Sequence, residues 1–552
     1  MAHAYATDVL VVGAGPVGLT AAAELRRRGV SCRIVDRLPA RLPFAKAVGI
    51  QPRTLEVWDR MGLVRAALDA AVPMRGQLTY VNGAEQPRID LVLPPEVPYG
   101  FAALPQYETE RILAEFLARF GTEVERGTEL VTFAQDAEGV TGRVRTPSGA
   151  EEEVRTRFLV GCDGAHSIVR KGLGLGFEGG AFPEEYMLAD VRVDWDLPHG
   201  YGVRSMHRDA SGAVDDILVC IPLPGPGRYR MSMMVPPELS TARQAQEDPD
   251  GIEHGLQTSR APELPDIQTV LDRLSPRPTT VSDIRWASVF RISHRIVDRY
   301  GDGRVFVAGD AAHIHPPTGA QGMNTGIQDA WNLAWKLALA VEGVAHPALL
   351  DSYDAERRPI GEEVVSRTVR HAAQGVQADP DDPETVMMRE AQLLLGYRDG
   401  PITGPPGEGP GPRPGDRAPD CAGLTGQITA YPLRLYDLLR DRGHVLLLYG
   451  DGRGFVELAR TARECSGGRM DTWALLAADA PSAPDGLPAY RDSASEFARH
   501  YAARQPTAFV IRPDGYLGAR LSPPTPQALR AHLATTFAVP AAPAAPAAPD
   551  QG

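Results

Sequence analysis

The sequence is poor in cysteine, in long apolar runs and in positive charge, and each shortage excludes a class of protein. Its 552 residues include five scattered cysteines and no Cys-x-x-Cys pair, so we expect reduced cytoplasmic thiols rather than a dithiol redox centre. No apolar run reaches the ~18 residues of a membrane-spanning helix, and the first residues lack the basic segment of an export signal. The net charge of −13 disfavours nucleic acid and anionic membranes as partners.

What remains is the composition of a large globular protein. Hydrophobic residues make up 43% of the chain and charged residues 23%, and both values are ordinary for soluble domains. The length predicts three or four domain-sized units. Because composition selects no chemistry, the function has to be sought in particular segments.

The N-terminal segment carries a nucleotide-binding pattern. A short β-branched run, DVLVV, leads into GAGPVG, then into a helix-forming stretch and a second apolar run that ends at Asp36. This strand–turn–helix–strand context is what makes a Gly-x-Gly-x-x-Gly motif specific for a dinucleotide. In that arrangement Gly13 makes the turn, Gly15 admits the pyrophosphate, Gly18 lets the helix pack closely, and Asp36 accepts hydrogen bonds from a ribose.

Two later segments repeat the order of apolar strand, acidic turn and helix. Asp163 follows the strand of RFLVGCDGAHSIVRK (157–171), and Asp310 follows the strand of VFVAGDAAHIHPPTGAQGMN (305–324). An acid at such a turn can accept hydrogen bonds from ligand hydroxyls, while glycines let the backbone approach closely and the helix start favours negative charge. Each acid has an alternative interpretation as a helix cap, which stays open.

Together the three segments resemble the signatures of the single-component FAD-dependent aromatic hydroxylases, the 4-hydroxybenzoate hydroxylase type. The resemblance continues in three further stretches and covers residues 5–375 in order. These stretches are KAVGIQPRTLEVWDRMGL (46–63), LPQYETERIL (104–113) and LLDSYDAERRPIG (349–361). The chain is most similar to the longer members that act on phenols and polyketides or modify antibiotics.

The resemblance implies an α/β fold with three parts. A Rossmann-like FAD-binding domain is interrupted by an inserted β-sheet substrate domain and followed by a C-terminal thioredoxin-like domain, which should be redox-inactive without Cys-x-x-Cys. A Pro/Gly-rich connector and a low-complexity tail that we expect to be disordered complete the chain. The boundaries are 1–177 and 286–398 for the FAD-binding domain, 178–285 for the substrate sheet, 399–418 for the connector, 419–538 for the thioredoxin-like domain and 539–552 for the tail.

The resemblance also implies which residues hold FAD. Asp310 matches the acid that binds the ribityl chain, and Asp163 matches an acid associated with both FAD and NAD(P)H. Lys46 and Gln106 fall near the phosphates and ribityl; Lys46 stands where arginine is commoner, which keeps the charge but loses bidentate recognition. The predicted cofactor set is Gly13, Gly15, Pro16, Val17, Gly18, Asp36, Arg37, Lys46, Gln106, Val131, Asp163, Asp310, Gly322, Met323 and Asn324.

The turn before the last helix is predicted to form one wall of the active site. Pro317, Thr318 and Gly319 shape this wall, His315 is a candidate for substrate contact, and His313 is interpreted as structural. No metal site is predicted, because no cysteine or carboxylate stands at ligand spacing from these histidines, and no catalytic base is assigned. Candidates for the opposite wall, from the substrate sheet, are Arg204, Met206, Arg230, Met231, Met233, Trp286 and Phe290.

The resemblance therefore implies an FAD-dependent monooxygenase of secondary metabolism. It would use NAD(P)H and O₂ to hydroxylate a phenolic or polyketide-type aromatic through a flavin C4a-hydroperoxide. Three alternatives stay open: the same oxygenase fold with epoxidation, Baeyer–Villiger oxidation or antibiotic inactivation as its outcome; a flavin dehydrogenase or reductase; and a non-catalytic FAD-binding protein. The Trp-x-Trp-x-Ile-Pro motif of flavin halogenases is absent. NADPH or NADH as donor, and homodimerisation, are left open.

Overall fold

The chain folds into two compact units in the computed structural model. The larger unit comprises Met1–Val341 and Tyr353–Leu395, and the smaller comprises Glu342–Ser352 and Gly396–Gly552. In the described part of the chain, sheets of eight, ten and three strands belong to the larger unit and one of six strands to the smaller. The structure describes residues 5–43, 45–236, 255–257, 261–374, 381–407, 409–429, 431–480, 485–504 and 506–538.

A mainly parallel sheet brings the three signature segments together. β1 (Thr7–Val12) lies between β2 (Cys32–Asp36) and β12 (Glu151–Gly161), parallel to both. The end of β12 also pairs in parallel with β20 (Val305–Val307). The strand order is β10-β11-β12-β1-β2-β9, with β20 and β19 off this path. The other strands are β9 (Val124–Arg126), β10 (Glu129–Gln135), β11 (Val140–Arg145) and β19 (Gly301–Asp302).

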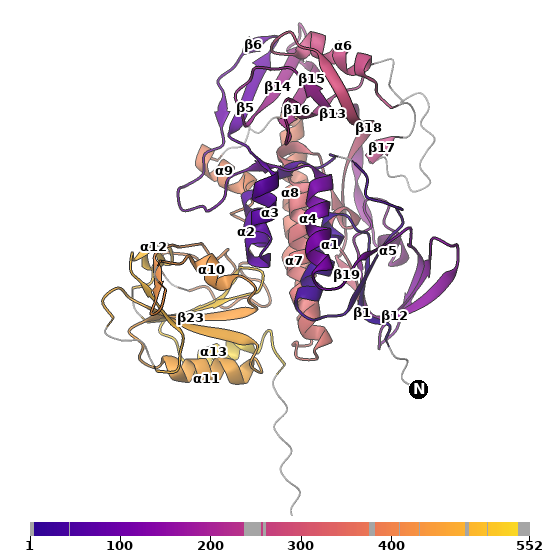
Figure 1. The fold of residues 1–552 in the computed structure, drawn as a ribbon. Coiled ribbons are helices and arrows are strands. Elements are labelled where there is room, and N and C mark those ends of the chain that lie inside the picture. The colour runs from indigo at the N-terminus through magenta and orange to yellow at the C-terminus, as the bar shows by residue number, and fades with distance from the viewer. Residues whose placement is uncertain are drawn as a thin grey trace, which may run out of the picture. The chain divides into compact units, whose positions relative to one another are not determined.

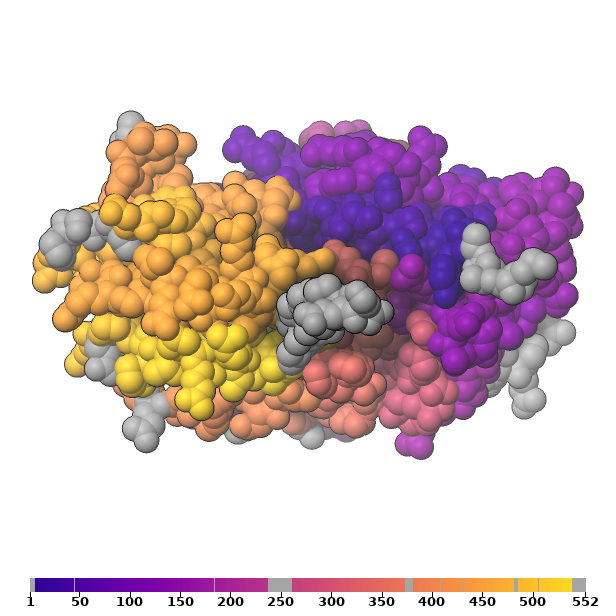
Figure 2. Space-filling model, turned by 90° about the horizontal axis from the view of Figure 1, so that it is seen from below, coloured from indigo at the N-terminus to yellow at the C-terminus, as the bar shows by residue number. Residues whose placement is uncertain are grey.

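Helices with small buried residues pack closely beside this sheet. α1 (Pro16–Arg27) buries a run of three alanines and contacts both α4 (Gln106–Ala118) and α7 (Gly322–Val341). Figure 1 shows these helices side by side, although α1 and α7 are far apart in sequence, and on the face in Figure 2 residues near the N-terminus (indigo) lie next to salmon-coloured residues from much later in the chain. The remaining helices of the unit are α2 (Pro52–Met61), α3 (Val64–Ala70), α5 (Ile168–Gly172), η2 (Gly309–Ala311), η3 (Thr318–Ala320), α8 (Ser352–Gln374) and α9 (Pro383–Glu390).

The ten-stranded sheet stands at the other end of the larger unit, with α6 (Leu264–Leu274) against it (Figure 1). Its order is β17-β18-β13-β16-β15-β14-β5-β6, with β21 beside β18 and β7 beside β5. The strand β18 (Val281–Val297) pairs with β13 along its whole length and, through its last residues, with β21 (His313–Ile314). The other strands are β5 (Gly76–Val81), β6 (Ala84–Glu85), β7 (Ile89–Asp90), β13 (Phe177–Val193), β14 (Tyr201–Arg208), β15 (Val214–Pro222), β16 (Arg228–Met234) and β17 (Gly255–Gln257).

The two faces of this large sheet differ because successive side chains alternate along each strand. One face forms a hydrophobic core with α6, which includes Met231 and Met233. The prediction that these two methionines line the active site is therefore wrong. The neighbouring even-numbered residues of β16, among them Arg230, lie on the opposite face.

A three-stranded sheet of β3 (Gly49–Ile50), β8 (Ala102–Ala103) and β4 (Val72–Pro73) belongs to the same unit.

The smaller unit has the thioredoxin arrangement. β23 (His444–Gly450) and β24 (Met470–Leu476) are parallel and joined by α11 (Phe455–Cys465), and β26 (Thr507–Ile511) pairs antiparallel with both β23 and β27 (Leu517–Leu521). Its core is rich in aromatic residues from strands and helices. The other elements are β22 (Leu424–Gly426), β25 (Ala489–Asp492), α10 (Leu435–Leu439), α12 (Glu496–His500) and α13 (Pro526–Leu533).

The sheets refine the expected domain ranges. The large sheet takes strands from outside 178–285, since β5 to β7 precede that range and β18 runs past its end. The range 399–418 falls in the smaller unit with 419–538, and the predicted tail 539–552 lies outside the described residues. No helix among the described residues is long and apolar enough to cross a membrane.

Candidate active site

Three turns leave the same edge of the parallel sheet side by side. Val12 and Val307 are both register partners of Gly161, and each is the last residue of its strand. The turns of the three signature segments therefore begin next to one another. In open parallel sheets, ligands bind outside the carboxyl ends of the strands, so this edge is the candidate site.

The three glycines of the first turn have different reasons to be glycine. Gly13 has a φ of 97°, and a Cβ there would lie 2.3 Å from the carbonyl oxygen of Cys162. A Cβ on Gly18 would lie 1.9 Å from the carbonyl oxygen of Gly13. Gly15, by contrast, has ordinary extended angles, and its Cβ would meet no protein atom within 4 Å. The open space beside Gly15 fits the pyrophosphate of a dinucleotide.

Asp36 lies at the end of β2, directly beside this turn. One carboxylate oxygen accepts a hydrogen bond from the Ala14 amide at 2.7 Å, and the other accepts from the Leu38 amide at 2.8 Å. The guanidinium of Arg126 lies 3.5 Å from Asp36. Arg126 is the register partner of Asp36 on β9, a position that sequence reasoning missed because strand pairing is not visible in one sequence.

Four further residues of the predicted cofactor set differ in how they are placed. Pro16 is the first residue of α1. The Val17 side chain occupies the space where a Cβ on Gly309 or Gly326 would lie, so Val17 joins the first and third segments by packing. Arg37 is exposed. Val131 lies where the register of β10 shifts.

Lys46 and Asp310 meet across the site. The ammonium of Lys46 lies 3.9 Å from the Asp310 carboxylate, and both side chains are partly exposed. The same ammonium lies 5.4 Å from the ring centroid of Phe290 on the large sheet. The side-chain oxygen of Gln106 accepts from the Ala47 amide at 3.3 Å, which holds the start of α4 beside Lys46.

Asp163 caps the helix that follows it. Its carboxylate accepts from the Ser167 hydroxyl at 2.5 Å and from the Ile168 amide at 2.8 Å, and burial raises its pKa. Arg170 is buried and donates to the Ala311 carbonyl at 3.3 Å, so it ties this helix to the third segment. These contacts support the interpretation of Asp163 as a helix cap. That Asp163 also binds a cofactor stays a prediction.

The start of α7 is held by a buried amide. Asn324 accepts from the Gln51 amide at 3.0 Å and donates to the carbonyls of Gly49 and Ala320 at 2.9 and 2.8 Å. Gln51 in turn donates its side-chain amide to the Gly319 carbonyl at 2.6 Å. The Asn324 side chain is thus engaged by protein, and it fixes the turn that precedes α7.

Gly322 and Met323 are half-buried at the first turn of α7. The first N–H groups of a helix have no partners within the helix and carry its positive dipole end, so they favour negative charge nearby. Pro317 and Gly319 are exposed and Thr318 is half-exposed. The predicted wall turn is therefore accessible beside a helix start that suits an anionic or electron-rich ligand.

A buried carboxylate behind the site organises this region. Asp329 of α7 accepts from the Gly309 amide at 3.1 Å, lies 2.8 Å from the His313 ring, and pairs with Arg357 of α8 at 2.8 Å. Burial alone would raise the pKa of Asp329, but Arg357 and His313 lower it below its usual value. His313 is accordingly structural, and neither Asp329 nor Arg357 was singled out from the sequence.

His315 is buried beside the α7 start with one ring nitrogen unused. Its side chain is 8% exposed, and Nδ1 lies 2.9 Å from the Pro316 carbonyl. Among the described residues, Nε2 has no hydrogen-bond partner, and a Cβ on Gly322 would lie 3.3 Å from it. Burial and the neighbouring His313 lower the pKa of His315 to about 4, against smaller opposing effects of the Pro316 carbonyl and Asp310.

We expect replacement of His315 by glutamine to reduce the acid sensitivity of the larger unit. The unfolded chain protonates this histidine near its ordinary pKa of ~6.5, whereas the folded chain does so only near 4. Stability should therefore fall as pH drops from about 6.5 to about 4, by on the order of a few kcal/mol, and the variant should lack this part of the slope. Urea titrations at several pH values, followed by flavin release, measure it.

The buried His532 of the smaller unit, whose pKa is also lowered to about 4 by burial, supplies a control. His532→Gln should leave the pH dependence of flavin release unchanged. An unaltered slope in His315→Gln would contradict the interpretation of His315 as neutral and buried.

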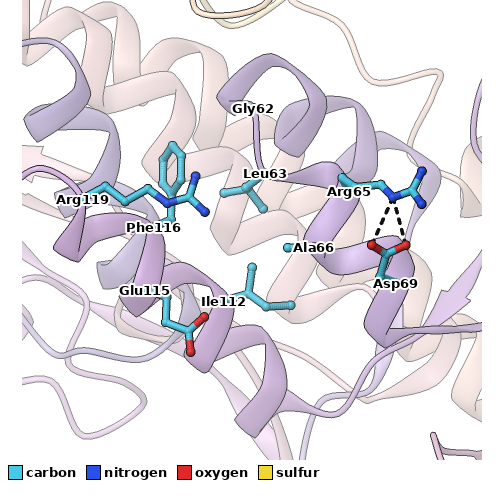
Figure 3. A pocket seen from close by; sticks show the side chains of 9 residues that line it. All are labelled: Gly62, Leu63, Arg65, Ala66, Asp69, Ile112, Glu115, Phe116 and Arg119. Carbon is cyan, nitrogen blue, oxygen red and sulfur yellow. Dashed lines mark hydrogen bonds and ion pairs between the residues drawn. The ribbon is translucent and has the colours of Figure 1, made fainter.

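A separate surface depression lies between α3 and α4 (Figure 3). It has a volume of about 320 Å³; Leu63, Ile112 and Phe116 line it, and Arg65 pairs with Asp69 at its rim. None of the predicted site residues lines this depression.

Among the residues that the structure describes, no group of three or more His, Cys, Asp or Glu could hold a metal ion, and all five cysteines are free.

The comparison with protein families agrees with this geometry. Residues 6–368 match the family model described as an FAD binding domain. The chain belongs to this family of FAD-dependent monooxygenases, and FAD is its cofactor.

The particular relatives cover almost the whole chain. It is 34% identical over 560 residues to 6-methylpretetramide 4-monooxygenase of Streptomyces rimosus, which covers 97% of this chain and 94% of the relative. It is 30% identical to pentachlorophenol 4-monooxygenase of Sphingobium chlorophenolicum, with 93% of each chain covered. The solved structure of anhydrotetracycline hydroxylase from Streptomyces rimosus is 30% identical with a TM-score of 0.70, covering 97% of this chain and 100% of that one.

Proposed function

We propose that this monooxygenase uses NAD(P)H and O₂ to hydroxylate a phenolic or polyketide-type aromatic substrate in secondary metabolism. The observation that carries the proposal is the double contact of Lys46, which lies beside both Asp310 and the ring of Phe290. The Lys46 side chain thus connects Asp310, the acid predicted to bind the ribityl chain, with an aromatic residue of the large sheet. A planar ring between Asp310 and the Phe290 face of the large sheet would lie next to the flavin end of the site.

The wall itself suits a planar apolar ligand. Leu188, Trp286, Phe290 and Ile292 form one buried cluster on the face of the large sheet opposite α6. Aromatic side chains favour stacked or edge-on contacts with other rings, and ligand pockets are mostly apolar with a few polar groups. The names of the two curated relatives specify oxygenation of 6-methylpretetramide and pentachlorophenol, which supports an aromatic substrate here.

In this proposal the residues bind, orient and exclude water. The space beside Gly15 takes the pyrophosphate, Asp36 accepts from the ribose, and Asp310 with Lys46 orients the ribityl chain. Bound FAD would take electrons from NAD(P)H and activate O₂, which is chemistry that no side chain supplies. The α7 start stabilises negative charge on its ligand, and the apolar sheet face keeps water from the reacting centre. His315 accepts a hydrogen bond at Nε2 from a substrate hydroxyl.

Three further points belong to the proposal. Hydroxylation is chosen over epoxidation, Baeyer–Villiger oxidation and antibiotic inactivation on the strength of the relatives' names. A cytoplasmic location is supported by the five free cysteines. Homodimerisation through the smaller unit is also part of the proposal, and a redox role for that unit is not expected because its sequence has no Cys-x-x-Cys pair.

The direct test is product analysis under labelled oxygen. The FAD-loaded protein is supplied with NADPH or NADH and a panel of phenols and polyketide aglycones, and NAD(P)H oxidation is followed with and without each compound. We expect stimulated oxidation and a product heavier by one ¹⁸O atom when ¹⁸O₂ is used. Oxidation that continues beyond one NAD(P)H per FAD without O₂, with the added compound as electron acceptor, would instead favour a dehydrogenase or reductase. A protein that binds FAD but shows no stimulation by any compound would favour a non-catalytic role.

A further inference from the structure

Two arginines of the large sheet have no hydrogen-bond or ion-pair partner among the residues that the structure describes. Arg230 of β16 is 7% exposed and Arg204 of β14 is half-buried. Among the described residues, neither guanidinium has a hydrogen bond or an ion pair, and the Nε atoms of both are buried without a partner. Arginine is always charged and carries five donors, and a buried charge without a partner is costly. Two such guanidinium groups are suited to a partner from outside the described residues, such as an anionic ligand.

The carboxylates of the sheet are already engaged by other cations. Asp190 is in register with Arg230, yet its carboxylate pairs with Arg228 at 3.2 Å. The other buried carboxylates of this sheet, in the part of the chain that the structure describes, also have arginine partners, in the pairs Glu185–Arg291 and Asp216–Arg273, both at 3.0 Å. Each of these acids thus has an arginine partner other than Arg204 and Arg230.

Both arginines lie on the face that looks toward the site. Arg228 and Arg230 are two residues apart on β16, so both lie on the face of Asp190, opposite α6. On β14, Val203 packs in the α6 core, which places Arg204 on the same face as Arg230. This face also carries Phe290, which Lys46 contacts. The unpaired cations and the aromatic wall therefore share one surface.

The surface between the two arginines is apolar. β15 lies between β14 and β16, and its residues Val219 and Ile221 are the register partners of Arg204 and Arg230. Two strand spacings, together with the two-residue offset between Val219 and Ile221, separate the backbones of the arginines by ~12 Å, which is about the length of a fused-ring aromatic. Burial lowers the pKa of Arg230 to about 10, so its guanidinium remains protonated at neutral pH.

We propose that Arg204 and Arg230 form an anion subsite for an ionised oxygen group of the aromatic substrate, either a carboxylate or an ionised phenol or enol. The inference rests on the proposed function and adds that the substrate carries a negative charge. Guanidinium groups bind carboxylate and phenolate oxygens through strong, charge-assisted hydrogen bonds. The apolar body of the substrate lies over the neighbouring strands, with its acidic oxygen at the arginines.

The test compares probes that differ only in charge. Anthraquinone-2-carboxylate and anthraquinone-2-carboxamide are titrated into the FAD-loaded protein, and binding is read from the change in flavin absorption. We expect the wild-type protein to bind the carboxylate at least about tenfold more tightly. Arg204→Gln and Arg230→Gln should each reduce this ratio to about threefold or less, and the double variant should abolish it. A parallel titration with 2-hydroxyanthraquinone, below and above the pKa of its phenol, distinguishes a phenolate from a carboxylate preference.

Controls separate charge recognition from structural damage. Arg192→Gln changes a half-exposed arginine of the same sheet, 4.0 Å from Asp283, and should keep the wild-type ratio. Arg230→Lys retains the charge and should restore part of the discrimination. Flavin content shows that each variant is folded.

Three results would overturn the subsite. These are equal wild-type affinity for the charged and neutral probes in both series, unchanged discrimination in the glutamine variants, and failure of every probe to bind. If uncharged phenols still stimulate NAD(P)H oxidation and gain oxygen, the proposed function stands and the anion subsite alone fails. If charge discrimination is found without any oxygenated product, the subsite stands and the proposed reaction fails.

Discussion

Gly15→Val should fold normally and yet purify almost without FAD. The backbone angles at Gly15 are available to any residue, and a Cβ there meets no protein atom within 4 Å, so the protein tolerates the new side chain. The added methyl groups would fill the space that the pyrophosphate needs. We expect FAD affinity to fall at least about a hundredfold, or ~3 kcal/mol. Flavin absorbance per protein and titration of the apoprotein with FAD measure the effect, and circular dichroism checks the fold.

Two other glycines serve as comparisons. A Cβ added at Gly100 would also meet no protein atom within 4 Å, and Gly100 has no left-handed φ, so Gly100→Val should retain full flavin content. Gly18→Ala should behave in the opposite way, with loss of stability as well as of flavin, because its Cβ would lie 1.9 Å from the Gly13 carbonyl oxygen. Normal flavin content in Gly15→Val would rule out this turn as the pyrophosphate site.

The second large effect is expected at Asp329. Asp329→Ala leaves the Arg357 guanidinium buried without its carboxylate and removes the acceptor of the Gly309 amide. Loss of one partner from a buried ion pair typically costs about 3–5 kcal/mol, so we expect a fall of roughly that size in the free energy of unfolding, measured by urea denaturation. FAD affinity should also decrease, because the Gly309–Asp310 turn loses its anchor.

A double-mutant cycle tests whether the pair is responsible. Arg357→Met combined with Asp329→Ala removes both charges, and the loss of stability should be clearly smaller than the sum of the two single losses. The surface pair Arg65–Asp69 is well exposed on both sides, and Asp69→Ala should cost less than about 1 kcal/mol. Additive losses at Asp329 and Arg357 would show that the two residues do not act as a buried pair.

The sequence was informative where a function depends on a short local pattern. The roles of Gly13 and Gly18 follow from spacing within six residues, and their close approaches to Cys162 and to each other agree with that interpretation. Asp36 follows from its place at the end of the second strand. These positions can be recognised in one sequence because a strand, a tight turn and a helix must succeed one another to form the motif.

Residues that depend on long-range pairing could not be found in this way. Arg126 reaches Asp36 only because β9 aligns with β2, and Asp329 meets Arg357 only because α7 packs on α8. The sequence also did not show which face of the large sheet each side chain lies on. Alternation along β16 is visible in the sequence, but only the packing of α6 decides that Met231 and Met233 face the core and Arg230 does not.

The length of β18 has a mechanical consequence. In its first half and at its middle the strand carries Trp286 and Phe290 of the buried aromatic cluster, and near its end Arg295 and Ile296 pair with the short strand that precedes the Pro316–Pro317 turn. Because one strand carries both features, we expect a ligand that displaces the aromatic cluster to shift the turn as well. By thermodynamic linkage, a ligand that favours one position of the wall changes the affinity for cofactor by the same factor as the cofactor changes the affinity for that ligand.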